Sequence, residues 1–82
     1  MKYQISYEKE ALKELEKLEP SVSRRIVDKI EKMSENPYSY DVKKLRASDY
    51  YRLRVGDYRV IFIFGNNIIR ILKVGHRQQI YY

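Results

Sequence analysis

The feature that most constrains the fold is a pair of alternating charged and apolar segments joined by a glycine. The segments span residues 50–55 and 58–64, with Gly56-Asp57 between them. Glycine at the first position of a two-residue loop is typical of a type II′ β-hairpin. If the residues that flank the loop pair with each other, Arg54 lies directly opposite Arg59, because side chains alternate between the two faces of a sheet. The chain is therefore predicted to contain a hairpin with one arginine-rich face.

The two faces of this hairpin differ in their chemistry. Arg52 shares a face with Arg54 and Arg59, and no acidic partner is expected beside them. The opposite face presents apolar side chains and is predicted to belong to the core: Leu53, Val55, Tyr58, Val60 and Phe62. Like charges that oppose each other across a sheet are destabilising. Three arginines on one face therefore indicate an anionic partner.

The distribution of charge along the chain points to the same kind of partner. Up to Pro37, eight lysine and arginine residues balance eight aspartate and glutamate residues. From Tyr38 onward there are nine basic residues against three aspartates, which accounts for the whole net charge of +6. Such asymmetry favours nucleic acid or another polyanion as the partner.

Length and composition exclude several other classes of protein. A chain of 82 residues is predicted to form a single domain, spanning residues 1–82. It has no cysteine and only one histidine, His76, so no disulfide, metal site or cofactor is expected. No apolar run approaches the roughly 20 residues that span a membrane, and the first residues lack the apolar region of a signal peptide. We therefore expect a cytoplasmic protein that does not enter a membrane.

The remaining elements follow from periodicity and from turn residues. Residues 3–7 alternate as a short strand, and residues 8–18 form an amphipathic helix. Pro20 begins a second helix, which Asn36-Pro37 ends, and residues 38–49 form a polar connection. A turn at 65–67 leads to a last strand, 67–74. The predicted fold class is α+β, in the order βααβββ, with an N-terminal helical hairpin packed on a mostly meander antiparallel sheet that the first strand joins.

Because side chains alternate along a strand, the last strand is expected to add residues to both faces of the hairpin. Counting through either possible two-residue loop puts Ile69 and Ile71 on the apolar face, with Arg70 and Leu72 on the arginine face. The sequence has no glycine-rich phosphate loop, nucleophile elbow or metal-ligand spacing. A basic and aromatic set remains: Arg52, Arg54, Arg59, His76, Arg77 and Tyr81, with Lys43, Lys44 and Arg46 nearby.

This set suits RNA. Arginine pairs bidentately with phosphate and could neutralise charge developing on a phosphorane. Tyrosine can stack on an unpaired base. The same residues would equally serve a binding module that performs no chemistry, and composition alone favours binding over catalysis.

Several motifs, taken together, are similar to those of a known family. Lys44-Leu45-Arg46, Tyr51-Arg-Leu-Arg-Val-Gly-Asp-Tyr-Arg-Val60 and Val74-Gly-His-Arg77, with Tyr81 behind them, resemble the RelE branch of the RelE/ParE toxin superfamily. Ala11-Leu-Lys-Glu-Leu15 and Asn36-Pro37 also fit the helical hairpin of that family. The resemblance covers nearly the whole chain.

The resemblance implies a toxin of a type II toxin–antitoxin system. RelE-like toxins enter the ribosomal A site and cut mRNA, with the 2′-hydroxyl of the mRNA as nucleophile. By resemblance, Arg52 and Arg54 hold the RNA and assist proton removal, and Arg59 stabilises the transition state. Arg77 stabilises the phosphate or the leaving oxygen, and Tyr81 stacks on the nucleotide. The remaining basic residues are expected to bind RNA: Lys43, Lys44, Arg46 and Arg70. The implied protein partner is a RelB-like antitoxin, an acidic helical chain.

Some residues depart from the pattern of the family. Arginine stands at positions 52 and 54, where the best-known relatives have lysine, and arginine is a poor general base. This leaves His76 as the candidate for acid–base work, since histidine titrates near neutral pH. Ala47 stands where many relatives have glycine, which should change only the loop. Spacing does not decide whether Tyr81 or Tyr82 faces the RNA.

Two alternatives remain open. A ParE-like toxin would share this fold but poison DNA gyrase, and it would lack the basic cleavage set. A noncatalytic RNA-binding domain would keep the arginines without the chemistry. The combination of the four arginines at positions 52, 54, 59 and 77 with Tyr81 favours the RNA-cutting branch.

Overall fold

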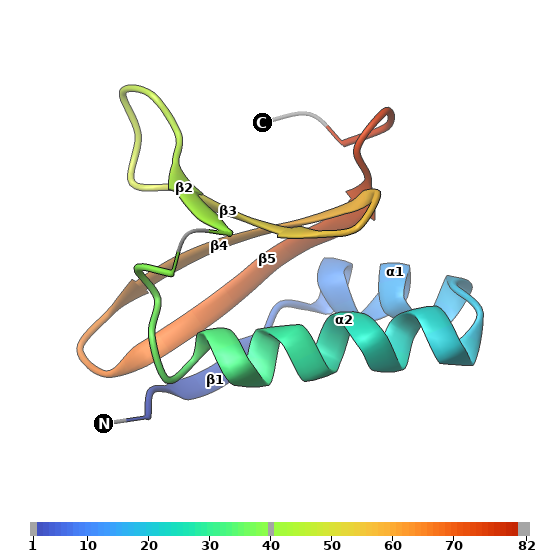
Figure 1. Cartoon of the computed structure of the whole chain (residues 1–82), viewed down its shortest axis with the longest axis horizontal. Helices are drawn as coiled ribbons and strands as arrows, with labels where there is room; N and C mark the ends of the chain where they lie inside the picture. Colours follow the sequence, from blue (N-terminus) through green and yellow to red (C-terminus); the bar gives the residue numbers. More distant parts are fainter. Residues whose placement is uncertain (1, 40, 81–82) are drawn as a thin grey trace.

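The chain folds into two layers, a sheet and a pair of helices that both lie on one face of that sheet (Figure 1). This computed structural model describes residues 2–39 and 41–80. In chain order the elements are β1 (Gln4–Tyr7), α1 (Lys9–Lys17), α2 (Pro20–Met33), β2 (Val42–Lys44), β3 (Tyr51–Val55), β4 (Tyr58–Gly65) and β5 (Ile68–His76). The predicted α+β fold is confirmed.

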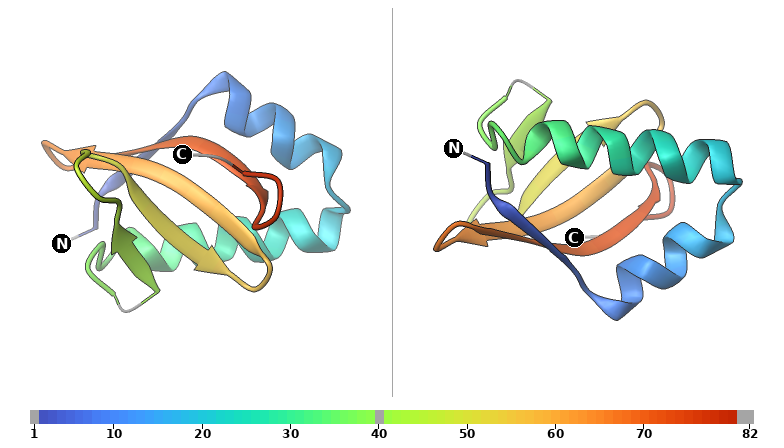
Figure 2. Two further views of the ribbon diagram at one scale, coloured as in Figure 1. Left: turned by 90° about the horizontal axis from the view of Figure 1, so that it is seen from above. Right: turned by 90° about the horizontal axis from the view of Figure 1, so that it is seen from below.

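The sheet is a meander with one added edge strand. Its strand order is β1-β5-β4-β3-β2, and the four strands from β2 to β5 pair antiparallel with their neighbours in sequence. β1 pairs parallel with β5, as the connection through the two helices allows. Seen along the normal to the sheet, the helices diverge from their tight link and cover the face behind it (Figure 2). The opposite face, which we call the outer face, carries no helix.

The strand β2 is the element that the sequence prediction lacked. It lies within residues 38–49, for which the sequence predicts only a polar connection. Four strands therefore follow the helices, and the observed order is βααββββ instead of βααβββ. Only Val42 of this strand packs against the core, while Lys43 and Lys44 are exposed. A strand of three residues with two lysines has too little alternation to be recognised from sequence. Lysines on an edge strand also discourage pairing with another chain.

The core lies between the helices and the inner face of the sheet. The helices contribute Ala11, Leu15, Ile26, Ile30 and Met33, and the sheet contributes Leu53, Val55, Val60, Phe62, Ile69, Ile71 and Val74, all buried. The predicted apolar face of the hairpin is therefore confirmed, with Tyr58 half-buried at its rim. Burying this face fixes the orientation of the hairpin, because a slip of one residue would expose the apolar side chains.

Two tight turns set the register of the meander. Val55 pairs with Tyr58 and Arg54 with Arg59, as predicted. Of the two loop residues between these strands, only Gly56 has a positive φ, at +57°, which fits a type II′ turn. In the next turn Asn66 and Asn67 both have positive φ, at 52° and 65°, which fits a type I′ turn.

A β-bulge in β5 changes the parity that alternation predicts. Phe62 pairs with Ile71 and Ile61 with Lys73, so Leu72 has no partner in the register. Strict alternation would have placed Lys73 on the core face and Val74 outside. The extra residue instead buries Val74 and leaves Lys73 exposed. A bulge inserts one residue into one strand and so inverts the faces beyond it.

The loop between β2 and β3 contains a strained alanine, which yields a stability prediction. Ala47 has φ of 56°, a left-handed conformation that costs an L-residue roughly 1–2 kcal/mol. Ala47→Gly removes this strain but adds freedom to the unfolded chain, worth about 0.4–1 kcal/mol. We expect a net gain of about 0.5–1 kcal/mol in the free energy of unfolding, measured by urea denaturation. Ala11→Gly, inside α1, should lower it; equal losses in both variants would contradict the strain.

Candidate functional site

Basic side chains occupy the outer face of the sheet in two adjacent rows. One row runs across the strands through Arg54, Arg59 and Gly75. The next row runs through Lys43, Arg52, Ile61 and Lys73. The segments that follow β2 and β5 both project from the sheet on this side, away from the helices (Figure 1). The outer face is therefore a basic surface flanked by two projecting segments.

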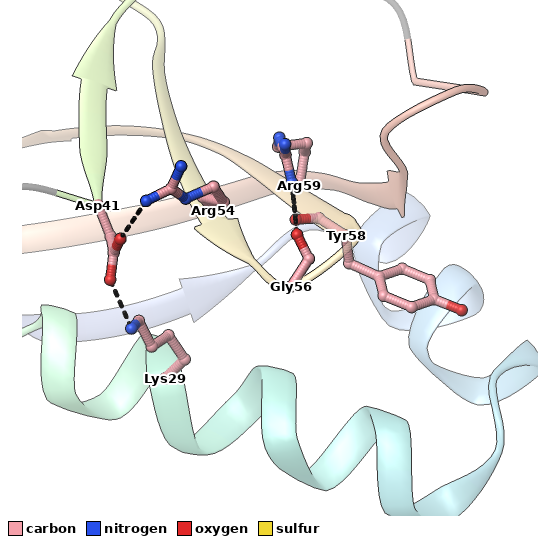
Figure 3. A network of polar contacts seen from close by, with 6 residues as sticks. All are labelled: Lys29, Asp41, Arg54, Gly56, Tyr58 and Arg59. Atoms are coloured by element: carbon pink, nitrogen blue, oxygen red, sulfur yellow. Dashed lines mark hydrogen bonds and ion pairs between the residues drawn. The ribbon is translucent and has the colours of Figure 1, made fainter.

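The β3–β4 turn holds two arginine side chains at one end of this surface. Arg59 Nη1 donates hydrogen bonds to the backbone carbonyls of Gly56 and Tyr58, both at 2.9 Å (Figure 3). The backbone N–H of Arg77 donates to the carbonyl of Asp57 at 2.8 Å, and its Nε lies 3.8 Å from Asp57 Oδ1. The turn therefore holds Arg59 on its own carbonyls and draws Arg77 towards it. Arg54 is the register partner of Arg59, and its guanidinium extends towards Asp41 (Figure 3). We call Arg54, Arg59 and Arg77 the turn arginines.

The prediction that the hairpin arginines have no acidic partner is wrong. Asp41 Oδ1 accepts a hydrogen bond from Arg54 Nη2 at 3.2 Å, and its Oδ2 accepts one from Lys29 Nζ at 2.6 Å. The side chain of Asp41 is only 13% exposed. Asp41 directly precedes β2, the strand that sequence periodicity does not predict, so this contact with Arg54 could not be inferred before the fold was known.

These two contacts alter the titration of Asp41. The hydrogen bond from Lys29, together with that from Arg54, holds the pKa of the Asp41 carboxyl below its ordinary 3.8, against the opposing effect of burial. A lowered pKa means that folding favours the charged carboxylate. Its contribution to stability is therefore fully present above pH 3.8 and is lost as the pH falls through the lowered pKa.

In the second row, a buried isoleucine lies between two basic residues. Ile61 is on the outer face but is only 2% exposed, and its register partners are Arg52 and Lys73. The aliphatic stems of such long side chains can cover an apolar neighbour while their charged ends reach solvent. Arg52 Nε is buried and has no hydrogen-bond partner among the described residues. Lys73 was not among the predicted site residues, and only the polarity mismatch at residues 73 and 74 could have revealed it.

The structure does not bring all predicted residues together. Lys43 and Arg70 are on the outer face, but Arg70 pairs with Ile63, which lies roughly 13 Å along β4 from Arg59. Lys44 pairs with Tyr51 and therefore belongs to the opposite face. Arg46 is exposed in the β2–β3 connection, one of the two projecting segments. Tyr81 and Tyr82 lie outside the described residues.

His76 ends β5, and because its register partner is Tyr58 its ring belongs to the inner face, opposite to the side chains of Arg54 and Arg59. It pairs with Tyr58, and the two rings meet edge to face with their centroids 5.6 Å apart. Its Nδ1 accepts a hydrogen bond from the backbone N–H of Gln78 at 3.2 Å. This contact assigns the proton of the neutral ring to Nε2. Nδ1 of His76 is therefore engaged within the chain.

The described residues offer few other kinds of site. Within 2–39 and 41–80, no group of three or more His, Cys, Asp or Glu side chains could hold a metal ion. No helix in the same ranges is long and apolar enough to cross a membrane.

The chain is similar to known toxins both in sequence and in fold. Residues 5–81 match the family model described as the ParE toxin of the type II toxin–antitoxin system parDE. A putative toxin RelE1 from Methanocaldococcus jannaschii is 34% identical over 99% of this chain and 97% of its own length.

Two solved structures share the fold over nearly their whole length. The archaeal RelE–RelB complex from Pyrococcus horikoshii contains a chain that is 32% identical, with a TM-score of 0.78, over 98% of this chain and 100% of its own. The toxin–antitoxin complex RelBE2 from Mycobacterium tuberculosis contains one that is 26% identical, with a TM-score of 0.84, over 94% and 100%.

Proposed function

Because the chain belongs to the RelE/ParE family of toxins from type II toxin–antitoxin systems, we propose that it cuts mRNA in the ribosomal A site in the cytoplasm. The proposed reaction is metal-independent. The 2′-hydroxyl of the RNA attacks the adjacent phosphate, and the protein positions the reactants and neutralises the charge that develops on the phosphorane.

The observation that carries this proposal is the cluster of turn arginines. Arg54 and Arg59 are register partners on the outer face, and a backbone hydrogen bond ties Arg77 to the turn between their strands. Guanidinium groups bind phosphate oxygens in a planar, bidentate manner and remain charged. Three of them at one end of a sheet could contact a single phosphate from different sides.

The proposed roles follow the resemblance. Arg59 stabilises the transition state, Arg77 stabilises the phosphate or the leaving oxygen, and Arg52 and Arg54 hold the RNA. Tyr81 stacks on the nucleotide. Of the outlying basic residues, three would contact the RNA backbone beyond the scissile bond: Lys43, Arg46 and Arg70. Lys44 belongs to the opposite face and is left out of this set.

The chemistry of the site favours charge neutralisation over general base catalysis. Arginine stays protonated in proteins, and Nδ1 of His76 is engaged by Gln78. The His76 ring also packs against Tyr58 on the inner face, so it would have to turn away from Tyr58 to reach an RNA bound on the outer face. The rate enhancement would therefore rest mainly on positioning and on electrostatic stabilisation.

The proposed protein partner is a RelB-like antitoxin. The similar toxins from Pyrococcus horikoshii and Mycobacterium tuberculosis were both solved as toxin–antitoxin complexes. We propose that an acidic helical antitoxin neutralises this chain by covering or distorting the outer face. The positive charge of the face supports this choice, since a complementary acidic chain would bind it rapidly.

The deciding experiment is primer extension on an mRNA incubated with programmed ribosomes, with and without the protein. The proposal expects protein-dependent cuts within the codon in the A site. If the protein instead lowers DNA supercoiling and leaves the mRNA intact, it is a gyrase poison. If it binds RNA without cutting it on ribosomes, it is a noncatalytic binding domain.

The arginine-rich face also leads to a prediction about salt. Phosphate contacts release counterions, so the logarithm of affinity for single-stranded RNA should fall with the logarithm of salt concentration by roughly 0.7 for each phosphate neutralised. The three turn arginines alone account for a slope of about −2, and the other proposed contacts should make it steeper; fluorescence anisotropy of a labelled oligonucleotide across a salt series measures it. Arg54→Ala should reduce the slope by about 0.7. A flat response in the wild-type protein would exclude this face as the docking surface.

A further inference from the structure

Asp41 connects the outer face of the sheet to helix α2. Its two carboxylate oxygens accept from different cations, Oδ1 from Arg54 of β3 and Oδ2 from Lys29 of α2 (Figure 3). The carboxylate is 13% exposed, whereas the side chains of Lys29 and Arg54 are 39% and 49% exposed. The acid is thus more sheltered than either cation that it holds.

The backbone fixes the same contact. The N–H of Arg54 donates to the carbonyl of Asp41 at 3.0 Å, so the two residues are joined through both main chain and side chain. The N–H of Val42 donates to the carbonyl of Ser39 at 2.9 Å, which closes the turn before β2. Asp41 therefore sits at a defined place beside Arg54 rather than on a free loop.

The geometry leaves Arg54 available to a ligand. The side-chain contact engages one nitrogen, Nη2, whereas a guanidinium has five N–H donors in a rigid plane. Orienting that plane in advance lowers the entropy that a long side chain loses when it binds a phosphate. Asp41 thus restrains Arg54 without using up its donors.

Lys29 prevents Asp41 from cancelling the charge of Arg54. Asp41 alone would neutralise the arginine and weaken its attraction for phosphate. With Lys29 on the second oxygen, the three side chains together keep a net charge of +1. The trio therefore orients a guanidinium and preserves its positive charge.

We propose that Asp41, supported by Lys29, is a positioning residue that aims the Arg54 guanidinium at the phosphate to be cleaved. This inference rests on the proposed RNA cleavage. It differs from two simpler roles. A purely structural contact would affect folding alone, and an inhibitory contact would hold Arg54 away from RNA.

The test compares RNA binding with cleavage in Asp41→Ala. Removing the carboxylate leaves Lys29 unneutralised, which strengthens RNA binding, and frees Arg54, which weakens it, so affinity for a single-stranded RNA oligonucleotide should change far less than the cleavage rate. Single-turnover cleavage of ribosome-bound mRNA should fall about tenfold to a hundredfold, because a misplaced catalytic group has that effect. Asp41→Asn should recover part of the rate, since its amide oxygen can still accept from Arg54. Glu16→Gln, which removes one exposed carboxylate from α1, is the charge control and should match the wild type.

A double-mutant cycle separates positioning from structural support. In an Arg54→Ala background, adding Asp41→Ala should cause no further loss of cleavage, because the residue through which Asp41 acts is gone. An additional loss equal to that in the wild-type background would overturn the proposal. An unchanged cleavage rate in Asp41→Ala would also overturn it. A rise in both RNA binding and cleavage in Asp41→Ala would overturn it too, because it would indicate that Asp41 inhibits Arg54.

One further measurement does not depend on catalysis. In the free protein, ¹⁵N relaxation of the Arg54 Nε–H bond should report greater mobility in Asp41→Ala than in the wild type or Glu16→Gln. If the wild type cuts no mRNA, the proposed function fails, and this measurement still decides whether Asp41 orients Arg54. Unchanged mobility would overturn the positioning role.

Discussion

Replacing Arg59 or Arg77 by alanine is expected to abolish growth arrest and codon-directed mRNA cleavage. Each substitution should lower the single-turnover rate on programmed ribosomes by about 10²–10³-fold, the usual effect of removing one electrostatic stabiliser of an anionic transition state. Both guanidinium groups are held next to the β3–β4 turn, where we propose that the phosphate binds. The readouts are growth after induction and primer extension.

The controls separate loss of chemistry from loss of fold. Arg24→Ala removes an exposed arginine of α2, on the other side of the sheet, and should leave cleavage unchanged. Arg59→Ala also loses two hydrogen bonds to backbone carbonyls, so its unfolding curve must be measured beside that of Arg77→Ala. If both variants remain folded and fully toxic while DNA supercoiling falls, the protein is a gyrase poison.

Phe62→Ala is expected to produce the largest loss of stability. Phe62 is fully buried in the centre of the sheet, and its ring stacks against Tyr51 at a centroid distance of 5.6 Å. Truncation removes this burial and leaves a cavity, at a cost of about 3–5 kcal/mol. That is a large part of the 5–15 kcal/mol by which domains are typically stable. Urea denaturation followed by circular dichroism measures the change.

Leu12→Ala is the matched control for this prediction. Leu12 is 45% exposed on α1, so the same kind of truncation should cost about 1 kcal/mol or less. A comparable loss in the two variants would show that burial in the sheet does not govern stability here.

The hairpin shows how far local sequence reasoning reaches. Its register, its type of turn and its buried face all follow from Gly56-Asp57 and from strict alternation on either side. Each of these properties depends on residues that are neighbours along the chain. The two helices, with Pro20 at the start of the second, were predictable for the same reason.

Departures from regularity were beyond sequence reasoning. The bulge at Leu72 inverts the faces of β5, and it brings Lys73 to the outer face. The polar Lys73 and apolar Val74 break the alternation of Ile69 and Ile71, but this break alone does not show which residue is inserted, since the bulge forms only when β4 and β5 pair. Of the remaining catalytic candidates, His76 is found with Nδ1 engaged by Gln78, a contact that depends on how the chain turns after β5.

The sequence by itself determined the α+β fold, the arginine-rich face and the family, because periodicity, turn residues and charge are local properties. Only the tertiary structure decided which charges meet. Asp41 is 12 residues from Lys29 and 13 from Arg54 along the chain, yet β2 and α2 bring all three into contact. An ion pair forms wherever two elements pack, and its partners are separated in sequence by the connection between those elements. Asp41 could therefore be identified as the acidic partner of the arginine-rich face only from the folded structure.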